Sequence, residues 1–552
     1  MHLSRAAAAT SIGVVAFPLW LGFARNGALD PDESQHLHAA WLVAQGRVPY
    51  VDFWEHHMPL VYYLLAPLTR RFVDSPDVYF AGRVVMLAVT GAALMLLYLV
   101  ARRVGSRDGA LAVALFCVQP SLIQYMTQIR PDVPALFTWL AALLALIRWR
   151  ETGRARWIWS TGLLLGVTAA FSPKAAYEIV GVTILIGMAA ACGRVPRRST
   201  LTALLRLTAG SAAPLILLCG WVWATGGDRA IRGFVRSAVI DNVAFPDPSK
   251  RLPFGVEGAA LVLLAGAGVF IVGRRLRLRA ITDPVHGPLL VPALVISILL
   301  LLPTTPAVYE YTWLPVTLAA TIYAATGVRA LVTIRSGRPW RSALLVLVAI
   351  GAFVYPAMAA TAAALRNRNA AALRDMQREL TYACPNDAVF DGTGLYVFRR
   401  SASRYAALVV GVRRRIGFGQ IPVTGVIAEL RSARAPVGLW DRRLRIIGGP
   451  IAAFAARYYV RQPDGLLLLG TTVVPPRAGE PGRAAIELLR DTLYRVGGPI
   501  GADLRIDGAA VSPGLLRLTA GAHSVTWSGL SGPVDITAST CAERLAAGPV
   551  DG

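Results

Sequence analysis

The sequence has little charge and almost no lysine. Only 16% of its 552 residues are charged and 55% are hydrophobic, a balance that excludes a single soluble globular domain. Lysine occurs twice among 56 basic residues, so arginine supplies nearly all of the positive charge behind the net +24. The arginines form short groups between apolar runs, and this spacing is typical of membrane topology rather than of nucleic-acid binding. The composition therefore indicates a polytopic membrane protein that binds no nucleic acid.

Cysteine is also scarce, with five residues in the whole chain. None of the spacings is that of zinc ligands, which excludes a zinc module of the usual kind. Cys117, Cys192 and Cys219 lie in apolar runs and are expected to be small buried hydrophobes. Cys384 and Cys541 lie in the polar C-terminal part, where export would favour a disulfide between them. Two unrelated buried thiols are the alternative.

Eleven apolar runs approach the length of about 20 residues that crosses a bilayer. Arginine groups occupy every second connection between these runs, and because positive loops stay in the cytoplasm, the N-terminus is predicted to be cytoplasmic. No clear cleavage site follows the first run, so we expect an uncleaved span. The expected spans are roughly 7–24, 80–101, 108–126, 133–149, 157–172, 175–192, 205–224, 256–273, 287–303, 312–328 and 341–361.

This topology predicts a transmembrane domain over residues 1–361 of a multi-pass protein of the cytoplasmic membrane, with an acidic first outer loop at 25–79. Within the loop, 37–44 and 59–68 are expected to form amphipathic helices on the membrane surface.

The C-terminal part is predicted to lie outside the cytoplasm and to have two compositions. Residues 362–472 mix helical and strand-like stretches, which predicts a small α/β domain. Prolines and glycines indicate a linker at 473–500, and alternating runs with turn residues predict a small β-sandwich-like region at 501–552. The expected fold class is thus an all-α polytopic membrane domain followed by an extracytoplasmic α/β domain and a β-rich end.

The first outer loop gathers the polar residues that a mostly apolar chain would not otherwise retain. Asp30, Asp32, Glu33, Asp52 and Glu55 lie there with four of the seven histidines, which are His36, His38, His56 and His57. Crowded carboxylates beside a bilayer persist where they bind a cation, position a substrate or move a proton. Asp32, paired with Glu33, is the predicted general base. The alternative is that Asp30 and Asp32 only cap a helix that begins near Ser34.

The same loop has the ligand types of a divalent-cation site. Carboxylate oxygens and imidazole nitrogens bind Mg²⁺, Mn²⁺ or Zn²⁺, although no strict motif spacing is present and ordinary surface hydrogen bonding is the alternative. The candidate ligands are Asp32, Glu33, His36, Glu55 and His56.

Three later turns on the same side of the membrane carry further candidates. Arg130 and Asp132 flank Pro131, where a proline-broken hairpin with a local ion pair is the structural alternative. Lys174 stands out because arginine replaces lysine almost everywhere else, and a compact ammonium suits a phosphate; chance retention is the alternative. Tyr309 and Tyr311 are expected to be interfacial aromatics that could also contact substrate.

In this arrangement the chain resembles the GT-C class of integral-membrane glycosyltransferases, in the branch of the protein O-mannosyltransferases and lipid A aminoarabinose transferases. The resemblance rests on Asp32-Glu33 after one span, the segment from Gly46 to Asp52 with Pro59 beyond it, the Arg130-x-Asp132 turn and Lys174. It covers roughly residues 1–330, and the α/β tail is similar to the soluble tails of bacterial members.

The resemblance implies an inverting transfer of a sugar from a polyprenyl-phosphate donor to a hydroxyl of a lipid, glycan or protein acceptor. By position, Asp32 would be the base or the carboxylate that positions the acceptor. Asp132 would support Asp32 or help to hold a cation, and Lys174 would meet the donor phosphate. Glu33 joins the catalytic candidates, and Arg130, Asp52, Tyr309 and Tyr311 join the substrate-binding ones.

Two other classes of protein remain as alternatives. A transporter or flippase for a lipid-linked glycan would usually place its ionisable residues near the bilayer midplane and show paired repeats, whereas here the charges gather at one membrane face. A non-catalytic glycan-binding or assembly protein is the other alternative.

Overall fold

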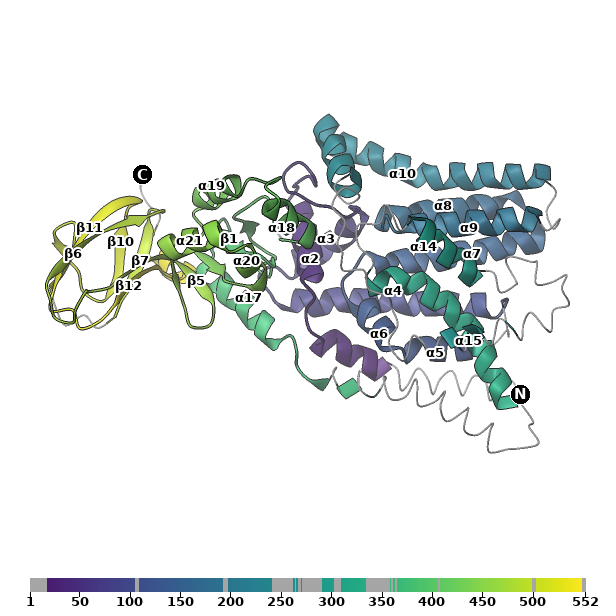
Figure 1. Cartoon of the computed structure of the whole chain (residues 1–552), viewed down its shortest axis with the longest axis horizontal. Helices are drawn as coiled ribbons and strands as arrows, with labels where there is room; N and C mark the ends of the chain where they lie inside the picture. Colours follow the sequence, from purple (N-terminus) through teal and green to yellow (C-terminus); the bar gives the residue numbers. More distant parts are fainter. Residues whose placement is uncertain are drawn as a thin grey trace.

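The computed structural model describes residues 17–104, 109–191, 197–240, 290–301, 309–333, 365–405, 408–498 and 503–548, with a few single positions between 262 and 362. The molecule is elongated along one axis (Figure 1). A bundle of helices occupies one half, an α/β unit follows it, and β-strands form the far end. This order of parts agrees with the order predicted from the sequence.

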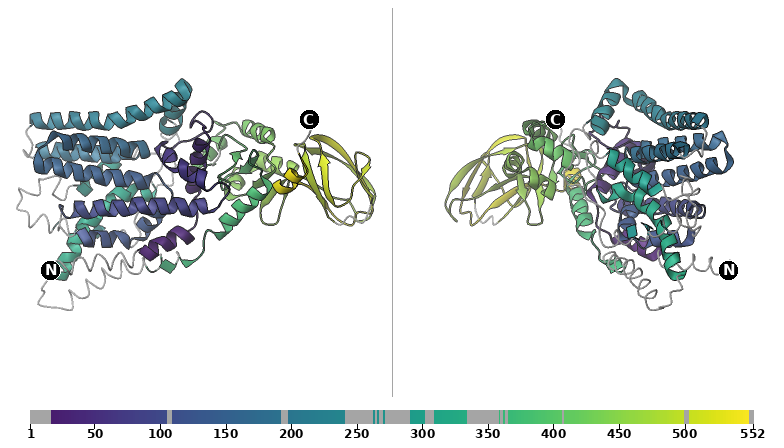
Figure 2. Two further views of the ribbon diagram at one scale, coloured as in Figure 1. Left: turned by 180° about the vertical axis from the view of Figure 1, so that it is seen from behind. Right: turned by 45° about the vertical axis from the view of Figure 1, so that its right-hand side comes forward.

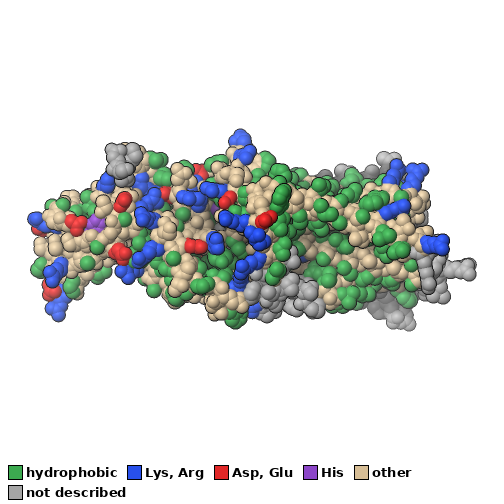
Figure 3. All heavy atoms as spheres, turned by 90° about the horizontal axis from the view of Figure 1, so that it is seen from above, with side chains coloured by type: hydrophobic (Ala, Val, Ile, Leu, Met, Phe, Trp, Pro, Cys, Tyr) green, Lys and Arg blue, Asp and Glu red, His purple; other side chains and the backbone are tan. Residues whose placement is uncertain are grey.

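The bundle is made of apolar helices that run along the long axis of the molecule (Figure 1). Among the described residues, three helices are long and apolar enough to cross a membrane, over Asp77–Ala101, Asp132–Thr152 and Arg198–Ala238. In space-filling view, hydrophobic side chains cover this half, and basic side chains gather at its far end and over the α/β unit (Figure 3). The bundle helices are α4 Asp77–Ala101, α5 Gly109–Cys117, α6 Pro120–Thr127, α7 Asp132–Thr152, α8 Ala155–Phe171, α9 Ala175–Ala191, α10 Arg197–Phe234, α14 Leu290–Leu301 and α15 Leu314–Thr333.

Seven of these helices coincide with expected spans, but the expected span at 108–126 is divided. It consists of α5 and α6, because Pro120 occupies the first turn of α6 and cannot continue α5. Most of the expected span 7–24, and nearly all of those at 256–273 and 341–361, lie outside the described residues.

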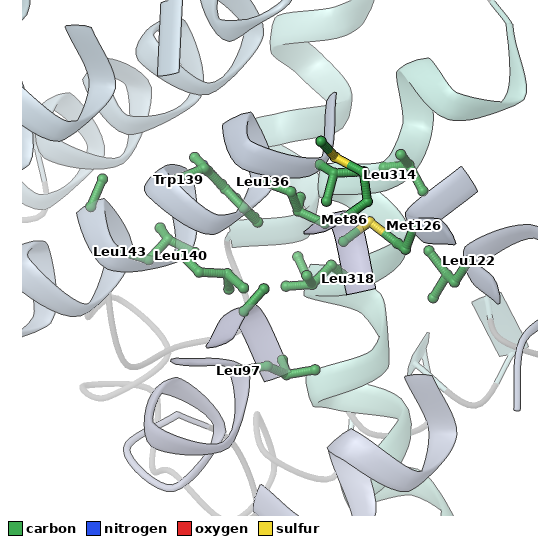
Figure 4. Close-up of a cluster of buried hydrophobic side chains, with 14 of the residues drawn as sticks. Met86, Leu97, Leu122, Met126, Leu136, Trp139, Leu140, Leu143, Leu314 and Leu318 are labelled. Carbon is green, nitrogen blue, oxygen red and sulfur yellow. The ribbon is translucent and has the colours of Figure 1, made fainter. Parts of the chain in front are cut away.

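Close packing holds the bundle together. Met86 of α4, Met126 of α6, Leu136 of α7 and Leu314 of α15 converge in one buried cluster (Figure 4). Helices α8 and α10 approach closely because Gly162 and its neighbour one turn on, Gly166, have no side chain: an added Cβ would lie 2.5 Å and 2.4 Å from backbone oxygens of α10. Small residues at a helix contact are a usual means of association in membranes.

Two short helices, α2 (Pro31–Ala44) and α3 (Leu60–Arg71), lie at the end of the bundle that faces the α/β unit (Figure 1). The prediction of a surface helix at 37–44 is wrong, because α2 begins at Pro31 and is buried on nearly all sides. It lies between the bundle and the α/β unit (Figures 1 and 2). The His38 ring nitrogen Nδ1 is 2.8 Å from the carbonyl oxygen of Val397, 359 residues along the chain.

The α/β unit has three short parallel strands, with β1 paired to both β2 and β3. Its elements are α17 Ala370–Tyr382, β1 Ala388–Asp391, β2 Arg400–Ser401, α18 Val410–Gly417, α19 Val423–Ala433, β3 Val437–Leu439, α20 Arg442–Ile447, α21 Gly449–Tyr458 and β4 Tyr459–Arg461. The segment after β1 contacts the bundle, since Tyr79 of α4 donates a hydrogen bond to the carbonyl of Leu395 at 3.4 Å. The carboxyl ends of the parallel strands therefore face the membrane domain.

Strand β5 joins this sheet to the β-rich end. It pairs antiparallel with β3 and with β12, so one eight-stranded sheet crosses both parts. The predicted linker at 473–500 is wrong in its second half, which contains strands β6 and β7; the turn residues that suggested a linker all precede or begin β6. The strands are β5 Leu466–Val473, β6 Gly482–Leu488, β7 Thr492–Gly497, β8 Asp503–Ile506, β9 Ala509–Ala510, β10 Gly514–Leu518, β11 Gly521–Ser528 and β12 Val534–Ala538.

A disulfide joins Cys384, before β1, to Cys541, the first residue of the last helix α22 (Cys541–Ala546). Of the two alternatives that the sequence left open, a disulfide or two unrelated thiols, the structure has the disulfide. It fastens the end of the chain to the α/β unit across 157 residues. Cys117 is a free buried thiol, as predicted, and Cys219 is free and half-buried.

Candidate active site

A capping box fixes the first turn of α2. Asp30 is the N-cap residue, and its Oδ1 accepts the N–H of Asp32 at 2.9 Å. In return, Oε2 of Glu33 accepts the N–H of Asp30 at 2.9 Å. The alternative that the acidic residues only cap a helix therefore holds for Asp30, with Glu33 in place of Asp32 as the second capping residue. Asp32 accepts neither of these bonds, and its side chain stays 26% exposed.

Glu33 links α2 to α4 and to the segment before α7, and protein encloses its side chain. Its side chain is fully buried, and Arg83 of α4 donates to its two oxygens at 2.8 Å and 2.6 Å. The N–H of Ile129 donates to Oε1 at 3.1 Å. Sequence reasoning missed Arg83, although a lone charge inside an apolar run is itself a signal of a buried polar contact.

Arg130 is the centre of the charged cluster. It is 3% exposed, and its guanidinium lies 3.2 Å from Oδ2 of Asp32, 3.7 Å from Asp30 and 3.4 Å from Asp132. The ring of Tyr311 lies 3.9 Å from its central carbon, a cation–π distance. One buried guanidinium thus contacts three carboxylates, which come from two segments that are far apart in the sequence.

Lys174 completes the cluster from the turn before α9. Its ammonium pairs with Asp132 at 2.7 Å and lies 4.0 Å from the ring centre of Tyr311. Burial lowers the pKa of Lys174 even though Asp132 opposes this shift. A small cavity of about 20 Å³ adjoins Asp132, Lys174 and Tyr311, which is enough for one water molecule. The sequence singled out Arg130, Asp132, Lys174 and Tyr311 separately, and the structure places them next to one another.

The carboxyls of Asp32 and Asp30 have different protonation tendencies. Burial opposes ionisation of Asp32, but the charge of the Arg130 guanidinium outweighs it and holds the pKa of Asp32 well below its usual range. The pKa of Asp30 is raised by burial and by the charge on Asp32. Asp32 is therefore the carboxylate that stays ionised and partly accessible.

The second polar cluster surrounds Glu55, which is 1% exposed. Oε1 of Glu55 accepts the amide of Gln35 at 2.9 Å, the N–H of His56 at 2.8 Å and the N–H of His57 at 3.1 Å. It also lies 2.9 Å from Nδ1 of His57. These bonds and the neighbouring imidazoles outweigh burial and hold the pKa of Glu55 well below its usual range.

This cluster has the composition of a metal site. One ligand atom each from Glu55, His56 and His57 lie within 4.8 Å of one another. His36 is fully buried, its ring centre is 4.7 Å from that of His57, and neither of its ring nitrogens has a hydrogen-bond partner among the described residues. Burial lowers the pKa of His36 to about 3, so its imidazole is neutral, as metal ligation requires.

The remaining candidates lie at the edges of the two clusters. Oδ2 of Asp52 accepts the N–H of Val48 at 2.7 Å and so fixes a turn. Tyr309 stacks on Tyr311 with ring centres 5.2 Å apart. Sequence reasoning also missed Tyr125, which donates to Glu310 at 2.8 Å beside the same rings.

The chain matches the family model described as dolichyl-phosphate-mannose-protein mannosyltransferase over residues 56–223. No curated protein sequence matches it. The matched segment contains the Glu55 neighbours His56 and His57, the Arg130 turn and Lys174.

Solved structures resemble the chain over most of its length. ArnT from Cupriavidus metallidurans in the apo state is similar with a TM-score of 0.56 and 12% identity, over 83% of this chain and 97% of that chain. The same protein bound to undecaprenyl phosphate gives 0.54 and 13% over the same shares. The oligosaccharyltransferase from Archaeoglobus fulgidus in the apo form gives 0.50 and 12%, over 84% of this chain and 74% of that chain. These likenesses show a shared fold.

Proposed function

We propose that this chain, which has the fold of the GT-C class of integral-membrane glycosyltransferases, transfers a sugar from a polyprenyl-phosphate donor to an acceptor hydroxyl at the outer face of the cytoplasmic membrane. The observation that carries the proposal is the contact of ionised, partly exposed Asp32 with Arg130, within reach of Lys174 through Asp132. ArnT bound to undecaprenyl phosphate supports the class of donor.

Asp32 is the group that receives the acceptor proton. The acceptor oxygen attacks the anomeric carbon, the bond from that carbon to the phosphate oxygen breaks, and the proton passes to Asp32. A carboxylate with a lowered pKa is a weak base, so it takes the proton late, when the new bond has made the hydroxyl acidic. Attack opposite the leaving phosphate inverts the sugar.

Arg130 and Lys174 supply positive charge for the phosphate that leaves. Charge fixed in a water-poor site stabilises developing negative charge strongly, because it needs no reorganisation during the reaction. Asp132 holds Lys174 at 2.7 Å and so acts as a positioning residue. Glu33, enclosed by Arg83 and backbone N–H groups, is a positioning residue too, and its predicted catalytic role is not part of the proposal.

The polar cluster around Glu55 fits a divalent cation, but its ligands differ from those that the sequence predicted. Glu55, His56 and His57 would hold such an ion, and one of the two orphaned ring nitrogens of the adjacent His36 is available as a further ligand. His57 takes the place of Glu33, whose oxygens are engaged elsewhere. A bound ion there would supply positive charge near Asp32. Chelation of the purified protein should lower its melting temperature, and His36→Ala should abolish that dependence; equal melting of chelated and untreated protein would argue against an ion.

The direct test uses purified protein and a panel of polyprenyl-phosphate sugars. The wild type should release polyprenyl phosphate from one of them, and Asp32→Asn should slow release by roughly 10²–10⁴-fold. Asp77→Asn is the matched control, because Asp77 is an exposed aspartate at the start of α4. Wild-type turnover in a correctly inserted Asp32→Asn variant would refute the assignment. A flippase would move the donor across the membrane without releasing polyprenyl phosphate.

A further inference from the structure

A polar cavity lies in the tail at the edge of the sheet where the parallel strands begin. It has a volume of about 300 Å³ and opens between the α/β unit and the turn from β6 to β7. Ala388, Arg400 and Arg434, which line it, stand at or before the amino ends of β1, β2 and β3. Since the carboxyl ends of these strands face the bundle, the cavity is separate from the Asp32 site.

The lining of the cavity is dominated by arginine. Arg400 and Arg434 are exposed at the rim, Arg490 is half-buried, and Asp387 is buried. The remaining lining residues are Asn386, Ala388, Ala433 and Asp491. None of these side chains is aromatic or large and apolar, so the cavity does not suit a hydrophobic ligand.

The two carboxylates of the cavity are already engaged. Asp387 pairs with Arg490 at 2.6 Å and with Arg544 at 2.9 Å, and Asp491 accepts the N–H of Ala520. By contrast, Arg400 donates only to the carbonyl oxygen of Asn386, at 2.8 Å. The side chain of Arg434 has neither a hydrogen bond nor an ion pair in the described part of the chain. Two guanidinium charges at the rim therefore have no carboxylate partner.

The positions of these groups are set by rigid neighbours. Arg434 follows the last turn of α19 in the left-handed region, with φ of 48°, the conformation in which many helices end. Below the rim, the N–H of Cys384 donates to Asp387 at 2.8 Å. The disulfide from Cys384 to Cys541 brings α22, and with it Arg544, to the same aspartate.

We propose that this cavity binds an anionic group, a carboxylate or a phosphate, carried on an extracytoplasmic sugar chain. The planar fork of arginine matches both groups in a bidentate way. A volume of about 300 Å³ is at the lower end for small-molecule sites and suits a single sugar unit with its charged substituent. That the ligand is a sugar chain rests on the proposed function. The site would hold the acceptor away from the membrane while its reacting hydroxyl reaches Asp32.

Binding to the full-length protein in lipid nanodiscs tests this site. The probes are a glucuronate oligosaccharide, a neutral glucose oligosaccharide of equal length and inorganic phosphate, measured by calorimetry. We expect affinity for at least one anionic probe and none for the neutral one. Arg434→Gln and Arg400→Gln should each weaken binding by roughly tenfold or more, the equivalent of one charge-assisted contact.

Two controls keep the result separate from catalysis and from folding. Arg477→Gln removes an 81% exposed arginine elsewhere in the β-rich part and should leave affinity unchanged. Asp32→Asn should bind as the wild type does even if the enzymatic proposal fails. Binding of phosphate alone would assign a phosphate-bearing ligand. Binding of the neutral probe with equal affinity, binding of no probe, or unchanged affinity in both rim variants would overturn the proposal.

Discussion

Adjacent carboxylates in α2 should respond to substitution in opposite ways. Glu33→Gln leaves the guanidinium of Arg83, which is 2% exposed, without its counter-charge. Removing one partner of a buried ion pair costs about 3–5 kcal/mol. Arg83 would keep the carbonyl oxygens of Ala24, Gly27 and Ala28 as acceptors, so we expect the lower end of that range. Asp32→Asn should cost less, because Arg130 would keep the carboxylates of Asp30 and Asp132 as partners.

Thermal unfolding of purified protein in detergent, followed by the fluorescence of its 13 tryptophans, measures the difference. We expect Glu33→Gln to unfold at a clearly lower temperature and to keep turnover in proportion to its folded fraction. Asp32→Asn should unfold near the wild-type temperature and lack turnover. The double variant Glu33→Gln, Arg83→Met should recover part of the lost stability, because no buried charge is left unpaired.

The outcome that would contradict this reasoning is specific. If the Glu33→Gln variant unfolded at the wild-type temperature and had no activity, Glu33 would be a catalytic residue, as its place in the sequence suggests. If both single variants were equally unstable, the exposure of Asp32 would not distinguish the two residues.

Three further outcomes follow from the site and the topology. Lys174→Ala should raise the donor concentration needed for half-maximal turnover and Lys174→Arg should restore it only in part, because a planar fork fits a point-charge site poorly; full activity of the alanine variant would make the turn structural. A reporter active only outside the cytoplasm should work after residue 365 and fail after Arg154, and a cytoplasmic signal from the tail would overturn the predicted orientation. Cys384→Ser with Cys541→Ser should destabilise the tail by up to about 4–5 kcal/mol, a cost set by loop closure, and limited proteolysis should then release α22 first; unchanged protection would contradict this.

The sequence was sufficient where a signal is local. Apolar length predicted the bundle helices, and the rarity of lysine drew attention to Lys174, which the structure places beside Asp132 and Tyr311. The interpretation of Asp32 and Glu33 as a pair was less successful. Successive residues of a helix point about 100° apart, so the two side chains lie in different surroundings. Glu33 meets Arg83, and Asp32 meets Arg130.

Contacts between distant segments could not be predicted in this way. The amphipathic pattern in 37–44 was interpreted as a membrane surface, but the structure covers α2 with the α/β unit, which the sequence places more than 300 residues later. The strands at Gly482–Leu488 and Thr492–Gly497 have partners in β11, β10 and β12, which lie further along the chain. Proline and glycine before them suggested a linker because turn signals mark where a strand begins as well as where structure is absent.

Because α2 is buried between the bundle and the tail, its final environment forms late in the synthesis of the chain. The loop with Asp32 leaves the ribosome early, but the segment that covers it, at Val397, follows 359 residues after His38. At synthesis rates of about 5–20 residues per second, that interval is roughly 20–70 s. During that interval, His38 and Tyr79 lack the contacts that Val397 and Leu395 make with them in the folded protein. The complete burial of α2 therefore has to wait until the tail has been synthesised and has docked on the bundle.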